Sequence, residues 1–128
     1  MATWNEVKSF LKNTLNAKES NNGTLTLTIE YTDGRSQLVV VAGRVFKDAE
    51  WADITSPVGT LSAGNINVAL EVLASVTCGG LVKFGEFHAV RHCIPIADVS
   101  NDELIVPLKV VAEVADLLEE KLVGGDNL

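Results

Sequence analysis

The sequence predicts an α+β domain in which an antiparallel five-stranded sheet packs against three helices, in the order α-β-β-β-α-β-β-α. Apolar residues recur at helical spacing in three segments, and they alternate with polar residues in others. Glycine-containing tight turns separate the alternating segments. The 128 residues suffice for one core, and no linker or repeat divides them, so we expect a single domain over 1–128.

The first helix is predicted over residues 3–15. Thr3 and Glu6 have the spacing of a capping box, in which each side chain satisfies a backbone N–H of the first turn. The apolar residues that follow recur at helical spacing: Trp4, Val7, Phe10, Leu11 and Leu15. The run Asn21-Asn22-Gly23 then separates this helix from the first strand.

A hairpin follows. A half-buried strand is predicted from four apolar residues that alternate with polar ones: Leu25, Leu27, Ile29 and Tyr31. Asp33-Gly34 is typical of a two-residue turn, from which the chain returns through a strand over 37–46. That register places Val39 and Val41 on the outer face, opposite the buried apolar residues. The two valines are therefore candidates for a binding surface.

The middle of the chain predicts a polar turn over 47–50 and a third strand over 51–56, which Pro57 and Gly59 end. Beyond Gly64, apolar residues at helical spacing predict a second helix that stops at the sequence Cys78-Gly79-Gly80. Strands over 81–84 and 87–96 follow. They are joined by Gly85-Glu86, which suits a type II′ turn.

A second capping box, Ser100 with Glu103, opens the last helix, and Gly124-Gly125 is expected to end it. Pro107 lacks the N–H that would bond to the carbonyl of Glu103, so the helix either kinks there or becomes regular from that residue. A second apolar row lies beside the first: Val106, Val110, Val114 and Leu117. Such a wide stripe is buried either within the monomer or between two copies of the chain.

The element order, together with Ser56-Pro57-Val58-Gly59, the strand end over 91–96 and the helix Ala115-Asp116-Leu117-Leu118-Glu119, resembles the YbjN-like and type III secretion chaperone-like superfamily. The likeness spans nearly the whole chain. It implies the fold of that superfamily and a homodimer that binds protein. Nothing in the sequence points to a secretion system.

Composition narrows the classes of partner. Ten Lys and Arg stand against 17 Asp and Glu, and the net charge of -7 repels phosphate backbones, so we expect no nucleic acid partner. No apolar run approaches the ~20 residues of a membrane helix, and residues 1–6 do not resemble a secretory signal. The sequence therefore predicts a cytoplasmic protein with no membrane partner.

Candidate metal and redox groups are few. His88 and His92 lie four residues apart on one predicted strand, about 13 Å at ~3.3 Å per residue, too far apart to share a metal ion. Cys78 and Cys93 would face each other if the last hairpin extended past residue 81, but a reducing cytoplasm favours two structural thiols. A disulfide or redox role is the alternative. No metal or cofactor is expected.

The remaining patterns do not indicate a catalytic site. Asp48, Glu50 and Asp53 lack the layout of a calcium loop, so we interpret them as a solvated turn. No phosphate-binding glycine motif and no G-x-S-x-G elbow is present. The sequence thus predicts a protein without enzymatic activity.

We therefore expect a non-enzymatic protein-binding, chaperone-like or regulatory module that acts as a homodimer. Its candidate surface consists of the apolar residues left outside the predicted core: Val39, Val41, Val106, Val110, Val114 and Leu117. The alternative is an enzyme or small-ligand protein with a pocket around Arg91, His92 and Asp116. A concave site holding those three groups would favour that alternative.

Overall fold

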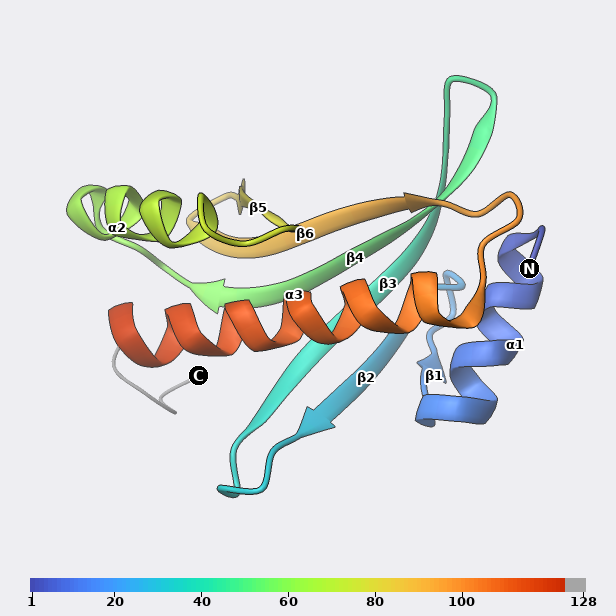
Figure 1. Cartoon of the computed structure of the whole chain (residues 1–128), viewed down its shortest axis with the longest axis horizontal. Helices are drawn as coiled ribbons and strands as arrows, with labels where there is room; N and C mark the ends of the chain where they lie inside the picture. The colour runs from blue at the N-terminus through green and yellow to red at the C-terminus, as the bar shows by residue number, and fades with distance from the viewer. Residues whose placement is uncertain (124–128) are drawn as a thin grey trace.

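The computed structural model describes residues 1–123 and has the predicted α+β architecture, with three helices packed on an antiparallel sheet (Figure 1). The helices are α1 (Trp4–Leu15), α2 (Ala63–Leu73) and α3 (Asn101–Leu122). The strands are β1 (Lys18–Glu19), β2 (Leu25–Glu30), β3 (Ser36–Phe46), β4 (Ala49–Gly59), β5 (Gly80–Phe84) and β6 (Phe87–Pro95). Within residues 1–123 the sheet has six strands in the order β1-β2-β3-β4-β6-β5.

The predicted count of five strands is wrong because the sequence analysis missed β1. This strand has two residues, and they pair with the first two residues of β2, Leu25 and Thr26. A segment so short contains no alternation from which a strand could be recognised. The turn over 20–23 that joins it to β2 was expected to be a break between elements.

The β2–β3 hairpin has a different register from the predicted one. Leu25 pairs with Val41 and Leu27 with Val39, so both valines lie on the face of the buried leucines and are themselves fully buried. The N–H of Tyr31 donates to the carbonyl of Arg35 at 2.9 Å, which closes a three-residue loop ending in Gly34 at φ +86°. One extra loop residue shifts the register by one, and this shift turns Val39 and Val41 inward.

Strand β4 is longer than predicted at both ends. Lys47 and Asp48 form a two-residue turn in which both have positive φ, and pairing resumes directly at Phe46 and Ala49. At the other end β4 passes through Pro57 and stays paired with β6. The β3–β4 pairs stop at Val40 and Thr55, so Pro57 is not required to donate to β3.

The β5–β6 hairpin follows the prediction. Phe84 pairs with Phe87 across Gly85-Glu86, and Gly85 has φ +63° as a type II′ turn requires. The pairing begins at Gly80, so it does not reach Cys78, and both cysteines are free thiols. Burial raises the pKa of the Cys78 thiol.

Helix α3 begins at the predicted capping box, where Ser100 and Glu103 each accept from the other's backbone N–H. It continues without interruption through Pro107 to Leu122, so of the two alternatives stated for Pro107, a regular helix that begins at that residue is wrong. The predicted stop at residues 124 and 125 lies outside the described residues. None of the helices in residues 1–123 is long and apolar enough to span a membrane.

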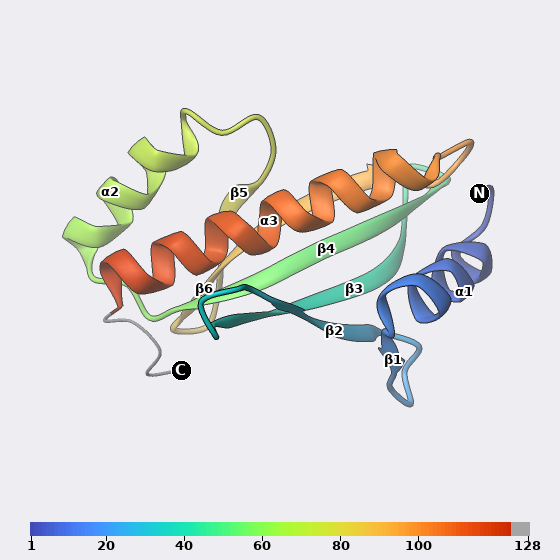
Figure 2. The same cartoon turned by 60° about the horizontal axis from the view of Figure 1, so that its bottom comes forward.

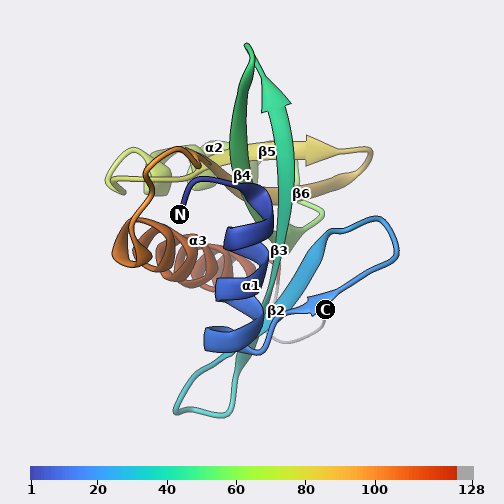
Figure 3. The same ribbon diagram turned by 90° about the vertical axis from the view of Figure 1, so that its right-hand side faces the viewer.

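All three helices lie on one face of the sheet, which we call the covered face (Figures 2 and 3). Helix α3 crosses β3, β4 and β6, while α1 packs at one end of it and α2 against β5 at the other. The core between the layers contains Leu11 of α1, Leu108 of α3 and Ile54 of β4, all fully buried. On the opposite side of the sheet no helix of residues 1–123 is packed, and we call this side the open face (Figure 3).

Candidate functional site

The open face combines apolar, aromatic and charged side chains. Alternation along each strand places one residue in two on this face. The strand pairing aligns the following residues there: Leu38, Val40, Ala42, Arg44 and Phe46 of β3, Trp51, Asp53 and Thr55 of β4, Arg91 and Cys93 of β6, and Phe84 of β5. The charged groups gather at the centre and the exposed aromatic rings lie around them.

An ion cluster forms the centre of the open face. The Nε atoms of Arg44 and Arg91 both contact Oδ2 of Asp53, the latter at 3.2 Å, and the hydroxyl of Thr55 donates to Oδ1 at 3.0 Å. Asp53 is 3% exposed, whereas the side chains of Arg44 and Arg91 are 53% and 31% exposed. The carboxylate therefore lies beneath two guanidinium groups that reach solvent.

The register explains why these three residues meet. Asp53 pairs with Ala42 on β3 and with Cys93 on β6, two small side chains that leave room around the carboxylate. Arg44 and Arg91 each lie two residues away from those pairs on the same face, one on each neighbouring strand. A central acid is thus approached diagonally from both sides, within reach of long side chains.

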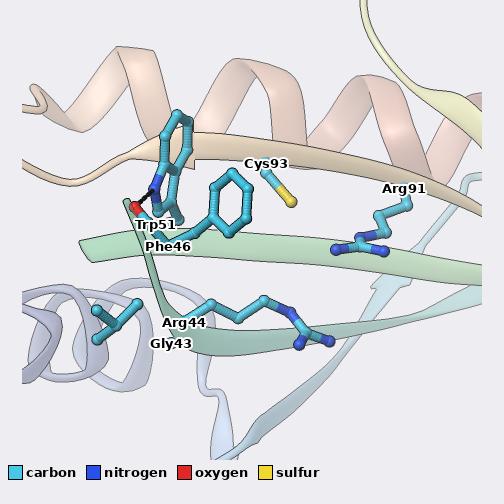
Figure 4. Close-up of a pocket in the computed structure, with 7 residues that line it drawn as sticks. Gly43, Arg44, Phe46, Trp51, Arg91 and Cys93 are labelled. Carbon is cyan, nitrogen blue, oxygen red and sulfur yellow. Dashed lines mark hydrogen bonds between the residues drawn. The ribbon is translucent and has the colours of Figure 1, made fainter. Parts of the chain in front are cut away.

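A hollow of about 550 Å³ lies beside the cluster, lined by Arg44, Phe46, Trp51, Arg91 and Cys93 together with Gly43 and Val45. The two aromatic rings stand at one end and the two guanidinium groups at the other (Figure 4). The Trp51 indole donates to the Phe46 carbonyl at 3.1 Å, which holds the aromatic end in place. Hydrogen bonding to Cys93 and the charge of Asp53 raise the pKa of Arg91, so its guanidinium group stays protonated and positively charged.

A second hollow of about 280 Å³ lies on the other side of Arg44. Its walls are apolar or uncharged apart from the ion cluster, and they include Val40, Ala42 and Phe84. Arg44 lines both hollows. The open face therefore presents cationic groups between two largely apolar depressions.

The predicted surface residues fall into three groups, which are buried, half-buried and exposed. Val39 and Val41 are fully buried and Val114 is 7% exposed, so these three lie in the core and are unavailable to a partner. Val110 is half-buried against the core. Val106 and Leu117 are 56% and 46% exposed, which leaves an apolar row on the outer side of α3.

The alternative pocket around Arg91, His92 and Asp116 is not formed. Arg91 and His92 are adjacent on β6, so their side chains point to opposite faces of the sheet. Arg91 contacts Asp53 on the open face, while His92 Nδ1 accepts from the Gly79 backbone N–H at 3.2 Å. Asp116, which lies on α3, forms an ion pair with Arg35 at 2.7 Å. The structure therefore does not bring together the three groups of the alternative site.

Both histidines serve as hydrogen-bond acceptors for loop backbone. His88 is 4% exposed, and its Nδ1 accepts from the Leu61 N–H at 3.2 Å, as His92 does from Gly79. Within residues 1–123 no three His, Cys, Asp or Glu side chains are grouped so as to hold a metal ion. The histidines position the segments before α2 and β5.

Arg44 and Asp53 are site residues that were not predicted from the sequence, and neither were the exposed Leu38, Phe46 and Phe84 around them. Asp53 was interpreted as part of a solvated turn, but it lies in the middle of a central strand and is buried. The available signal was the alternation of Trp51, Asp53 and Thr55 with the apolar residues of β4. Arg44 and Arg91 can be aligned with Asp53 only after the register of three strands is known.

Comparison of the chain with protein-family models, curated proteins and solved structures found no match. The superfamily resemblance therefore stays a prediction from the sequence. The functional assignment rests on the geometry of the described residues.

Proposed function

We propose that this chain is a non-enzymatic protein-binding module that acts as a homodimer, with the open face for a partner protein and the outer side of α3 for a second copy. We also propose that the chain is a member of the YbjN-like and type III secretion chaperone-like superfamily. Its support is the element order, which matches the expected one once the two-residue β1 is set aside.

The observation that carries protein binding is the exposure of large apolar side chains on the open face. Phe46, Phe84 and Leu38 are 63%, 49% and 44% exposed, and they surround the ion cluster. Exposed apolar groups gathered on one face mark interaction sites, whereas isolated ones are common on any surface. Aromatic and arginine side chains are also the residue types enriched where proteins bind one another.

The dimer is supported by the outer side of α3. Val106 and Leu117 are separated by 11 residues, about three helical turns, so they lie on the same side of the helix. In Figure 1 α3 runs across the front of the molecule, and no other helix or strand of residues 1–123 lies over it. The exposed side of α3 between Val106 and Leu117 is therefore available to pack against a second copy of the chain.

An antiparallel pairing of two copies of α3 satisfies both apolar and charged groups. With a two-fold axis midway between positions 111 and 112, Val106 lies opposite Leu117 of the partner subunit. The same axis brings Asp102 opposite Lys121 of the partner subunit and Lys109 close to Glu113 of the partner subunit. The surface is thus self-complementary, as a two-fold interface requires.

Light scattering tests the homodimer. We expect a mass of twice 13.7 kDa at micromolar concentration. Leu117→Glu should give the monomer mass with unchanged circular dichroism, because it places a charge in the proposed interface, opposite the apolar Val106 of the partner subunit, but outside the core. Val45→Glu, on a residue 75% exposed in the β3–β4 hairpin, is the matched control and should stay dimeric. A monomer mass at every concentration up to several hundred micromolar contradicts the dimer.

Partner binding is tested by capture from a native extract with immobilised protein. We expect the double variant Phe46→Ser, Phe84→Ser to lose specifically bound proteins, because both side chains are exposed on the open face. The control is Val68→Ser on α2, also an exposed apolar position but on the other side of the sheet. The same set of bound proteins for all three baits contradicts binding through the open face.

A further inference from the structure

We propose that the open face recognises an acidic side chain flanked by apolar side chains in an extended segment of the partner, with Arg44 and Arg91 binding its carboxylate. The inference rests on the proposed protein-binding function and specifies the chemistry of the partner. Three features of the open face carry it.

The first feature is the unused donor capacity of the two arginines. Each guanidinium has five N–H donors in a planar fork, and Asp53 is contacted through the Nε of each. Asp53 itself is occupied, since its other oxygen accepts from Thr55 at 3.0 Å. The buried acid therefore holds the two cations in position, and their partly exposed guanidinium groups keep further N–H donors with which to bind a second carboxylate.

The second feature is the sign of the charge on the open face. The strand residues there include three cations, Lys18, Arg44 and Arg91, and two anions, Glu30 and Asp53. The chain as a whole has a net charge of -7, so the open face is cationic on an acidic protein. Acidic segments are therefore attracted to this face and repelled elsewhere.

The third feature is the position of the two hollows on either side of Arg44. The larger one offers the rings of Phe46 and Trp51, and the smaller one offers Val40 and Phe84. In an extended peptide, residues i and i+2 point the same way about 7 Å apart. An acidic residue with apolar residues two positions before and after it can place its carboxylate at the arginines and one apolar side chain in each hollow.

Selection from a random heptapeptide library displayed on phage tests this chemistry. On the wild-type protein we expect enrichment of peptides with an acidic residue between apolar residues. On the double variant Arg44→Gln, Arg91→Gln we expect the acidic preference to disappear while the apolar preference remains. The matched control is Lys83→Gln, which removes a cation from β5 that is outside both hollows.

The outcomes separate this inference from the proposed function. Enrichment of apolar peptides without an acidic residue overturns the acidic recognition and leaves protein binding in place. Enrichment of phosphorylated or otherwise modified sequences in a matched array, at the expense of Asp and Glu, also overturns it. A library from which nothing is enriched overturns both.

A binding measurement with one selected peptide completes the test. We expect Arg44→Gln or Arg91→Gln to weaken binding about tenfold or more, and Glu→Gln in the peptide to have no further effect on the double variant. Because these variants remove support from buried Asp53, a second readout uses the wild-type protein. The peptide should slow labelling of Cys93, which lines the larger hollow, by a thiol reagent and leave Cys78 unaffected. Equal labelling of Cys93 with and without saturating peptide contradicts the proposal.

Discussion

The two faces of the sheet are built from the same strands, yet they differ in chemistry. On the covered face, residues such as Val41, Ile54 and Val90 are fully buried beneath the helices. On the open face, most alternate residues of the same strands are half-buried or exposed, and the buried Asp53 lies there beneath the partly exposed Arg44 and Arg91. The covered face stabilises the fold by excluding water, and this leaves the open face available for recognition.

Buried polar groups are satisfied differently on the two faces. On the covered face two of these groups, Gln37 and Ser56, bond to uncharged partners, while Glu119 of α3 is a buried charged residue. Gln37 donates to Ser56 at 2.9 Å and to the Pro57 carbonyl at 2.7 Å, and Ser56 donates to the Leu38 carbonyl at 2.6 Å. The open face contains a buried charge, Asp53, which needs two cations to offset its desolvation.

The largest expected effect is the difference between introducing one hydroxyl on the covered face and introducing one on the open face. Val41→Thr should lower the free energy of unfolding by about 1–3 kcal/mol, because the new hydroxyl is buried among apolar groups. Val40→Thr, on the next residue but on the open face beside Thr26 and Thr55, should change it by less than about 0.5 kcal/mol. Urea unfolding measures both. Equal losses would show that the two faces are equally buried and contradict the β2–β3 register.

The loop that sets that register provides the next test. Gly34→Val should destabilise the fold by about 1–2 kcal/mol, because a β-branched residue is forced to φ +86° although no atom lies within 4 Å of the new Cβ. Gly64→Ala is the control, since Gly64 is a helical glycine with similar open space and no positive φ. An unchanged thermal midpoint for Gly34→Val would show that the strain is absent.

The smallest effect concerns the border of the covered face, where Glu19 of β1 binds Lys8 and Lys12 of α1. These contacts lower the pKa of Glu19 from 4.5 to about 2. Since the folded pKa is depressed, the stabilisation is present above pH 4.5 and is lost as the pH falls toward 2. Wild type should therefore lose more stability over this window than Glu19→Gln in denaturant titrations. Parallel pH profiles for the two proteins contradict this link.

The accuracy of the sequence predictions depended on how local each signal was. The capping residues Thr3 and Ser100 marked two helix starts correctly, because capping involves residues within one turn. The predicted capping box is complete only at Ser100, since Glu6 accepts from the Ala2 N–H and not from the Thr3 N–H. The Gly85-Glu86 turn was also correct, whereas Asp33-Gly34 was assigned one loop residue too few. A one-residue error in a loop reverses the facing of a whole strand, as it did for Val39 and Val41.

The sequence by itself determined the α+β class, the three helices and five of the six strands, because periodicity and capping are properties of neighbouring residues. It did not determine which residues meet across strands. Asp53 gained Arg44 and Arg91 as partners, and Asp116 gained Arg35 instead of Arg91, through pairings between segments far apart in the chain. The covered face and the open face become distinct only when the helices pack on the sheet. The tertiary structure therefore decided which apolar residues form the core and which form the candidate surface, since burial depends on contacts that no short segment contains.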